Sequence, residues 1–395
     1  MRDPVKDRIV FATDFSPLLP DRTASPAASV YLPLHGGDDG FYHDRILLGN
    51  LVAEAKKQLT AAFGKRSFAS LAETLEYIVA NPAEIVGDKG VRGLGVLATN
   101  EQACVYRLPF PVEPRVQVGE TFFLKPLLRD FQYGSRYVLL GLSADRFSFI
   151  RGSFTSLDRA VLPVGTDDQF SELYPLEYDG RPALDYTTLE GHMSPYHNYR
   201  SRDDVRKEES EKFFRYVGET VSKHLMPACE VPVVLVALPE HQALFRRVAD
   251  IGCLLDEGIE QNVDELSTAE LLADAAAVIG RAREARASSL IKDYANRRAH
   301  GGSTDDAAEI GMALVERKVR ALFVEEGREL PGTFDEATGK VSHETKADHG
   351  ERGDLAGSDL ADALAQAALR QGGDVYVLAA SDMPTKAGAA ALFRY

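Results

Sequence analysis

The amino-acid sequence predicts a mixed α/β (α+β) protein built of three domains. Short apolar runs such as VPVVLVAL (231–238) have the length of buried strands, and longer stretches repeat apolar residues every three or four positions, as amphipathic helices do. The two kinds of segment alternate along much of the chain, an order typical of sheets covered by helices. A chain of 395 residues suits two or three domains, and we place them at 1–134, 135–267 and 268–395.

Composition narrows the class of protein. Apolar residues make up 45% of the chain, which is ordinary for a soluble globular protein. The formal net charge of −15 opposes attraction to bulk phosphate, so a nucleic-acid contact would have to use a local basic patch. The cysteines, Cys104, Cys229 and Cys253, show no CxxC spacing, and we expect reduced core thiols. The N-terminus lacks an apolar signal region and no run reaches membrane-spanning length, so we expect a cytoplasmic protein without a membrane partner.

The first domain is predicted to be a small α/β unit. Residues 1–27 show little periodicity and are expected to form a loose lead-in. The predicted elements that follow are a strand at 29–35, a turn at 36–40, helices at 44–63 and 70–79, strands on either side of Asn100, and a strand at 115–124. The glycines of 87–95 precede a strand instead of joining a strand to a helix, so no phosphate-binding loop is predicted there.

A polar loop and a long amphipathic helix organise the middle domain. An antiparallel meander is expected before them, with strands at 136–143, 145–153 and 156–163. The loop, 187–202, leads into a helix at 201–226 with Ser201 as its N-cap. Four apolar residues recur along one side of this helix: Phe213, Val217, Val221 and Leu225. Such a stripe predicts that the helix packs on a core and holds the loop at its start.

The last domain alternates helices and strands. Its predicted elements are helices at 268–296, 307–318 and 360–373 and strands at 319–326, 374–380 and 390–395. The segment 327–354 is charged and rich in glycine, and we expect a mobile loop there. This alternation favours a compact three-layer domain.

The start of the long helix carries the best candidate for a nucleic-acid surface. Between Tyr196 and Lys207 there are four Arg or Lys residues against two Asp residues, and three of the neighbouring side chains are Tyr or His. Aromatic side chains stack on unpaired bases and Arg pairs with phosphate. An ordinary solvated helix start with surface charges would explain the same residues.

The order of these segments resembles the middle domain of archaeal and eukaryotic class-one release factors and Pelota. That domain also has a loop, a long charged helix, a short apolar strand and another helix. SLIKDYANRRAH (289–300) and the segments after it resemble the third domain of those factors, and AALFRY (390–395) resembles its final strand. The N-terminal segment YLPLHGG (31–37) resembles the bacterial archaeo-eukaryotic release factor family instead. The resemblance implies a ribonuclease H-like middle domain and a C-terminal three-layer α/β/α domain.

The same resemblance implies a ribosome-associated protein acting in translation stress, rescue or hibernation. Its partners would be ribosomal RNA, the acceptor end of tRNA and a translational GTPase, and no cofactor or metal is implied. The residues expected to contact RNA or the ribosome are Gly191, His192, Met193, Tyr196, His197, Tyr199, Arg200, Arg202, Arg206 and Lys207.

The loop departs from the release-factor pattern at the residues that carry peptide release. Gly191-His192-Met193 stands where release factors have Gly-Gly-Gln, and the sequence has no glutamine between Gln169 and Gln242. Met193 cannot donate a hydrogen bond, so peptidyl-tRNA hydrolysis is not expected. His192 is a weak candidate for a general base, because no Ser, Cys or carboxylate partner follows from the spacing. Two alternatives stay open: a hydrolase that acts on an RNA or ester through His192, and a protein-interaction scaffold.

Overall fold

The computed structural model describes residues 5–12, 26–35, 37–64, 67–87, 91–108, 110–129, 136–153, 156–173, 202–229, 231–343 and 359–395. Several sheets with helices packed on them make up this part of the chain, which confirms the predicted mixed α+β class. The chain forms two compact units: unit 1 combines residues 1–135 with 284–395, and unit 2 comprises 136–283. The division into domains at 1–134, 135–267 and 268–395 remains a prediction.

The N-terminal sheet of unit 1 has five strands in the order β1-β4-β3-β2-β5. They are β1 (Ile9–Phe11), β2 (Ala27–Pro33), β3 (Gly93–Ala98), β4 (Ala103–Leu108) and β5 (Arg115–Gly119). The prediction of a loose lead-in is wrong for residues 6–11, which form a short helix, η1 (Lys6–Arg8), and strand β1. β1 pairs in parallel with β4, almost a hundred residues later, and no local periodicity reveals such a pairing.

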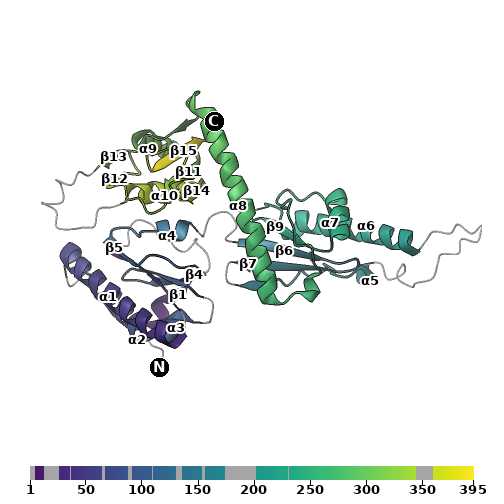
Figure 1. Cartoon of the computed structure of the whole chain (residues 1–395), viewed down its shortest axis with the longest axis horizontal. Coiled ribbons are helices and arrows are strands. Elements are labelled where there is room, and N and C mark those ends of the chain that lie inside the picture. Colours follow the sequence, from purple (N-terminus) through teal and green to yellow (C-terminus); the bar gives the residue numbers. More distant parts are fainter. Residues whose placement is uncertain are drawn as a thin grey trace, which may run out of the picture. The chain divides into compact units, whose positions relative to one another are not determined.

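Helices cover one face of the N-terminal sheet (Figure 1). They are α1 (Gly37–Phe63), α2 (Ala69–Ala80) and α3 (Pro82–Val86). Val30 of β2 lies fully buried against Leu59 of α1 and Leu75 of α2 in one apolar cluster. The turn predicted at 36–40 is wrong, because α1 already begins at Gly37.

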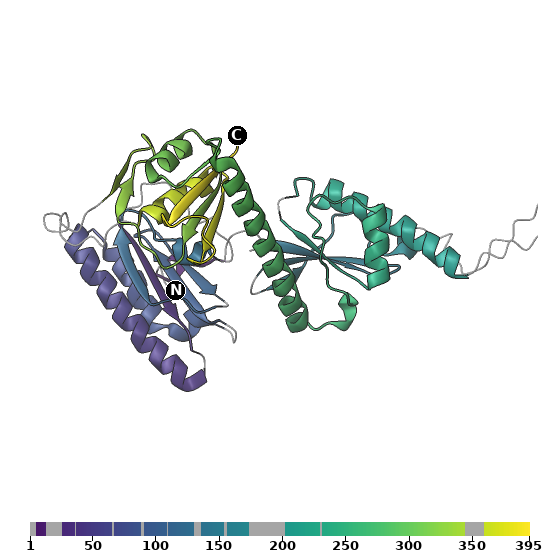
Figure 2. The same ribbon diagram turned by 45° about the horizontal axis from the view of Figure 1, so that its top comes forward.

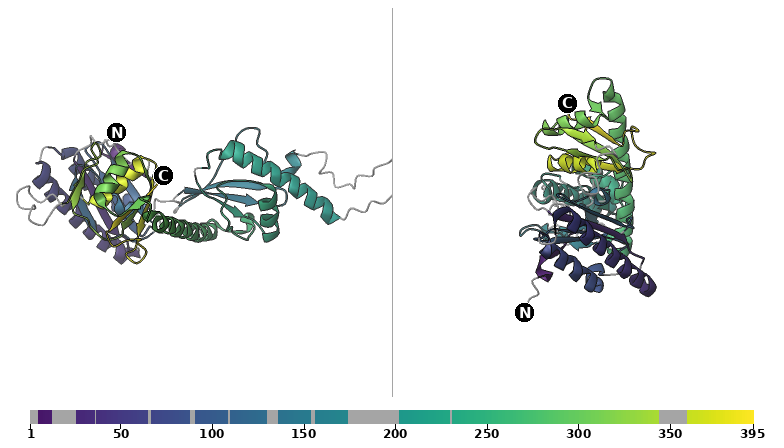
Figure 3. Two further views of the ribbon diagram at one scale, coloured as in Figure 1. Left: turned by 90° about the horizontal axis from the view of Figure 1, so that it is seen from above. Right: turned by 90° about the vertical axis from the view of Figure 1, so that its left-hand side faces the viewer.

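The other face of this sheet packs on α4 (Lys125–Leu128) and on the C-terminal part of unit 1. That part contains α9 (Ala307–Val315) and α10 (Leu360–Arg370), with a sheet in the order β10-β15-β11-β14. The strands of that sheet are β10 (Ser303–Thr304), β11 (Val319–Glu325), β14 (Asp374–Leu378) and β15 (Ala389–Phe393), which confirms the three predicted strands. α10 is buried nearly all round, because it lies between the two sheets (Figure 3, right).

The C-terminal sheet also has a helix on its second face. α8 (Thr268–Arg298) contributes Leu290 and Tyr294, which pack on Phe323 of β11. The sheet therefore has helices on both faces, as the predicted three layers require, and its likeness to the third domain of release factors remains a prediction. The predicted mobile loop at 327–354 is wrong in part, since its described residues include a hairpin of β12 (Gly332–Phe334) and β13 (Val341–His343).

Unit 2 is a sheet between two layers of helices (Figure 2). Its strand order is β8-β7-β6-β9, with β6 (Arg136–Leu142), β7 (Phe147–Ser153), β8 (Leu157–Arg159) and β9 (Val233–Val236). The first three strands form the predicted antiparallel meander, and β9 lies parallel to β6. The helices are α5 (Phe170–Leu173), α6 (Arg202–Thr220), α7 (Pro239–Val248) and the first half of α8, with two short turns, η3 (Val221–Leu225) and η4 (Val263–Glu265).

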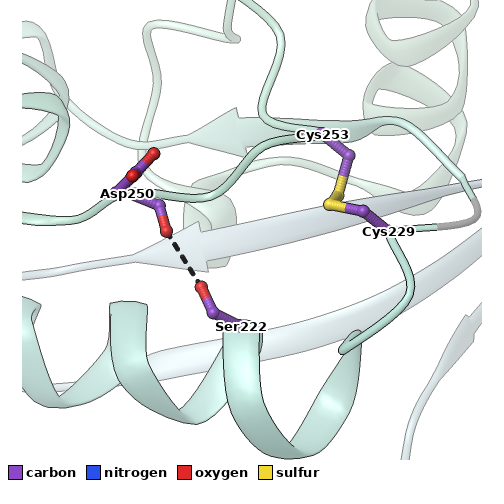
Figure 4. The surroundings of a disulfide bond; sticks show 4 residues. All are labelled: Ser222, Cys229, Asp250 and Cys253. Carbon is purple, nitrogen blue, oxygen red and sulfur yellow. Dashed lines mark hydrogen bonds between the residues drawn. A yellow bond between two sulfur atoms is a disulfide. The ribbon is translucent and has the colours of Figure 1, made fainter.

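The prediction of reduced core thiols is wrong for two of the three cysteines. Cys229 and Cys253 form a disulfide (Figure 4). Cys104 is free and buried. Beside the disulfide, the hydroxyl of Ser222 donates a hydrogen bond to the carbonyl oxygen of Asp250 at 3.0 Å. The two links fasten the end of the α6–η3 helix to the segment that follows α7. Among the described helices, none is both long and apolar enough to span a membrane.

Candidate nucleic-acid interface

The apolar stripe predicted for the long helix is confirmed. Phe213, Val217 and Val221 are each 0% exposed, and Leu225 is partly buried against the same cluster. They lie on the face of α6 and η3 that covers the unit 2 sheet, where they meet apolar residues of β6, β7 and β9. The spacing of three or four residues between apolar side chains therefore correctly predicts which side of α6 faces the core.

Aromatic rings hold α6 against its neighbours. The ring of Phe213 contacts Phe147 of β7 and Phe170 of α5, with ring centroids 6.3 and 6.2 Å apart. Phe214 meets Phe245 of α7 edge to face at 5.9 Å. Such pairs add to the stabilisation from burial, so the middle of α6 is anchored from two sides.

Close backbone approach and hydrogen bonds add to this anchoring. A side chain at Gly218 would bring its Cβ to 2.5 Å from the Cβ of Ala249, so glycine is needed for α6 to pass the end of α7 this closely. Tyr216 accepts a hydrogen bond on its hydroxyl from the backbone N–H of Asp167 at 3.1 Å. Of the α6 side chains that the structure describes, Ser210 is the first buried one, and its hydroxyl donates to the carbonyl oxygen of Ala144 at 3.4 Å.

Exposed residues of α6 precede that core. Lys207 and Glu208 are exposed, and α6 begins eight residues before Ser210, which is about 12 Å at 1.5 Å per residue. Figure 2 shows this end of α6 running past the edge of the unit 2 sheet. The start of α6 is thus continuous with a helix whose later turns are anchored on the core.

Ion pairs neutralise the exposed cations farther along the helix. Arg215 pairs with Glu211 at 2.5 Å, and Lys223 pairs with Glu219 at 3.0 Å. Arg247 of α7 also approaches Glu211, at 3.5 Å. Exposed pairs of this kind contribute little stability, but they cancel the positive potential of the later turns. A local basic patch on unit 2 is therefore better sought at the start of α6 than along its length.

The structure describes few of the predicted contact residues. Those that lie outside the described residues are Gly191, His192, Met193, Tyr196, His197, Tyr199 and Arg200, together with the predicted N-cap Ser201. Arg202 and Arg206 lie in the first two turns of α6, and Lys207 is exposed beside them. The predicted contact surface, including the weak catalytic candidate His192, remains a prediction.

A pocket of about 730 Å³ beside α7 is a poor alternative site for an anion. Three of its four charged lining residues are acidic: Asp256, Glu257 and Glu260, against Arg246. The guanidinium of Arg281 lowers the pKa of Glu257 by hydrogen bonding to it, which keeps that carboxylate charged. Arg246 donates through Nη1 to the carbonyl oxygen of Leu255 at 2.7 Å, whereas its buried Nη2 has no partner among the described residues, so this single cation faces three carboxylates.

The sequence interpretation missed a cluster of His35, His43 and Asp44 in unit 1. His35 follows β2, and the other two residues lie in the second turn of α1. A pair of histidines on either side of a helix start was the available signal, but it becomes informative only when the strand end is known to pack on that helix.

The comparisons with known proteins agree with the resemblance in the middle of the chain. Residues 134–287 match bacterial archaeo-eukaryotic release factor family 8, and this range contains the whole of unit 2. The predicted recognition of that family is thus confirmed for this part of the chain. Comparison with curated proteins gave no match.

Comparison with solved structures gave matches to release factors and Pelota proteins. The archaeal translation termination factor aRF1 is 13% identical, with 93% of this chain and 92% of that chain covered and a TM-score of 0.20. Dom34 of S. cerevisiae, a translation termination-like factor, is 13% identical over 75% and 73% of the two chains, with a TM-score of 0.34. A ribosome-bound archaeal Pelota is 11% identical over 98% and 95%, with a TM-score of 0.34.

Proposed function

We propose, from the match of residues 134–287 to the bacterial archaeo-eukaryotic release factor family, that the protein is a ribosome-associated factor. The proposal includes a role in translation stress, rescue or hibernation rather than in termination. A ribosomal partner requires a cytoplasmic location, where the Cys229–Cys253 pair would meet reducing conditions. The family match is the observation that carries the proposal, since it covers the unit that holds α6.

The contact we propose is made by the loop 187–202 and the first turns of α6. Support comes from the anchoring of α6 from Ser210 onward and from the exposure of Lys207 and Glu208 just before it. The chain is acidic overall, so affinity for ribosomal RNA must come from a local patch, and Arg200, Arg202 and Arg206 supply the cations there. The acceptor end of tRNA and a translational GTPase are the further partners that the family resemblance suggests.

Binding should depend on these three arginines and not on overall charge. Replacing Arg200, Arg202 and Arg206 by Glu should lower ribosome affinity at least tenfold and flatten the log–log salt dependence by roughly one unit per lost phosphate contact. Tyr199→Ala should weaken binding without changing that slope, because stacking releases no counterions. Co-sedimentation with ribosomes at several salt concentrations measures both quantities.

The matched control reverses three cations on the later turns of the same helix: Lys212, Arg215 and Lys223. It makes the same change in net charge, and these residues lie beyond Ser210. The control should bind with the wild-type slope. If both triple variants lose affinity equally, bulk charge governs binding; if neither does, the loop and helix start are not the contact surface and a scaffold role becomes the better description.

The protein should not release peptide from a ribosome that carries peptidyl-tRNA. The loop has Gly191-His192-Met193 and no glutamine, so it lacks the side chain that positions water at the ester in release factors. A release assay with a stoichiometric amount of protein, on sense and stop codons, tests this. Release that disappears in Met193→Ala would show that the loop is hydrolytic after all, and loss in His192→Ala would favour the alternative of a His192-dependent hydrolase.

A further inference from the structure

Three potential metal ligands meet at the start of α1 in unit 1. The imidazole Nδ1 of His35 lies 2.7 Å from Oδ1 of Asp44, and Nδ1 of His43 lies 3.8 Å from the same oxygen. One ligand atom from each of the three side chains falls within 4.8 Å of the others. The two imidazole rings meet edge to face, with centroids 5.2 Å apart.

Local structure explains why these residues come together. β2 ends at Pro33 and α1 begins at Gly37, so the chain reverses within a few residues. A Cβ at Gly40 would lie 3.1 Å from the carbonyl carbon of His35, so the missing side chain lets the first turn of α1 pack against that backbone. One turn later Asp44 faces back, and its Oδ2 accepts the backbone N–H of His35 at 2.8 Å.

The burial of the three side chains differs in a way that suits a metal site. The Asp44 side chain is only 7% exposed, whereas those of His35 and His43 are 53% and 68% exposed. Among the described residues, the ion-pair partners of Asp44 are these two imidazoles, so no Lys or Arg ammonium or guanidinium of that part of the chain balances it. A buried carboxylate is costly without a compensating positive charge, and a cation bound on its solvent side would supply one.

We propose that His35, His43 and Asp44 bind a divalent transition-metal ion, with Zn²⁺ as the preferred ion. Two imidazole nitrogens and one carboxylate oxygen are a ligand set that Zn²⁺ accepts at about 2.0–2.2 Å. Both imidazole rings are largely exposed, so they can rotate to close the remaining distances. Three protein ligands leave a coordination position open to solvent, where a water molecule or an anionic oxygen can bind.

Metal titration of the full-length, untagged protein after chelator treatment tests the proposal. One equivalent of Co²⁺ should give visible absorption typical of nitrogen and oxygen ligands, and Zn²⁺ should displace it. His35→Ala and His43→Ala should each lower the affinity at least tenfold, as should Asp44→Asn. Far-UV circular dichroism of each variant checks folding; the exposed ring of His43 makes His43→Ala the decisive variant if Asp44→Asn or His35→Ala fails to fold.

Two controls fix the location of the ion. His300→Ala removes an exposed histidine elsewhere in unit 1, and a His192→Ala/His197→Ala variant removes the pair in the loop 187–202. Both should bind Co²⁺ as the wild type does. The proposal is overturned if the wild type shows no saturable binding, if His43→Ala binds equally well, or if the loop variant is the one that loses the ion. None of these outcomes depends on ribosome binding.

Discussion

The interiors of the two units are held together by different kinds of contact. Around α6, unit 2 buries aromatic and aliphatic side chains, with a disulfide at the end of the helix. Where the N-terminal sheet of unit 1 meets α10, ionisable side chains are buried: Lys125 is 5% exposed, and Asp359 and Asp362 are each 4% exposed. Apolar contacts are insensitive to pH, whereas buried charges are not. The stability of unit 1 should therefore depend on pH, and that of unit 2 on its apolar packing and its disulfide.

The polar contacts of unit 1 join segments far apart in the sequence. Lys125 forms an ion pair with Asp359 at 3.3 Å. Asp362 accepts the backbone N–H of Leu124 at 2.9 Å, and Gln366 donates to both Asp362, at 2.8 Å, and the carbonyl oxygen of Phe122, at 2.7 Å. The buried polar groups of residues 122–125 thus bond to those of Asp359 and α10, so these bonds specify how α10 fits against the N-terminal layer. Losing one partner would leave a buried polar group without a hydrogen bond.

The largest effect should come from a charge in the apolar interior of unit 2. Val217→Asp places a carboxylate at a fully buried position with no cationic partner in the cluster, which should cost roughly 4 kcal/mol or more. Hydrogen exchange followed by mass spectrometry should show lost protection in peptides of unit 2 while those of unit 1 keep theirs. Lys207→Asp, at an exposed position of the same helix, is the control and should exchange as the wild type does. Unchanged protection in Val217→Asp would contradict the placement of α6 on the core.

A smaller effect should appear in unit 1 as the pH changes. Burial, and then the charge of Asp359, raises the pKa of Asp362 from 3.8 to about 7. Between these values the folded state holds a proton that the unfolded state has lost, so the free energy of unfolding falls as the pH rises. A shift of about 3 pKa units corresponds to about 4 kcal/mol at most, spread over that window.

Comparison with Asp362→Asn isolates this contribution from those of other carboxylates. The amide of Asn keeps an oxygen for the N–H of Leu124 but does not ionise. The stability of the wild type relative to the variant should therefore decline from pH 4 to 7 in unit 1 peptides, and remain level in unit 2. Parallel curves for the two proteins would mean that Asp362 titrates normally.

The smallest of the three effects should follow reduction of the disulfide in unit 2. Cys229 and Cys253 are 24 residues apart, and closing a loop of that length stabilises a fold by about 3 kcal/mol. A reductant should lower the melting temperature of the wild type and leave a Cys229→Ser/Cys253→Ser variant unaffected. An equal melting temperature of the wild type with and without reductant would show that the disulfide does not stabilise unit 2.

The sequence predicts what depends on local periodicity and misses what depends on distant pairing. The stripe of Phe213, Val217 and Val221 follows from a repeat of about four residues, so α6 and the core face of unit 2 could be predicted. β1 has only three residues and exists through its pairing with β4, and the cysteines carry no spacing that indicates a bond.

Of the two candidate sites, one could be predicted from the sequence and the other required the structure. Charge and aromatic content single out the start of α6 without any structure, although the contacts of the loop 187–202 lie outside the described residues. The cluster of His35, His43 and Asp44 depends on Gly40, which lets a helix turn approach a strand end. Nothing in the spacing of these residues distinguishes that packing from an ordinary exposed helix start.

The shared core of unit 1 has a consequence for the growing chain. Tyr31, Leu97 and Tyr106 of the N-terminal sheet share one buried cluster with residues of α10 and β15. After the first 135 residues are made, a ribosome must still add residues 136–391, which takes on the order of ten to fifty seconds at about 5–20 residues per second. Unit 2 is contiguous in sequence and can fold during that interval. One apolar face of the N-terminal sheet stays uncovered for the same time, so chaperones can bind it and it can aggregate. The N-terminal sheet is thus synthesised first, but its second face is covered only when α10 and β15 have been made.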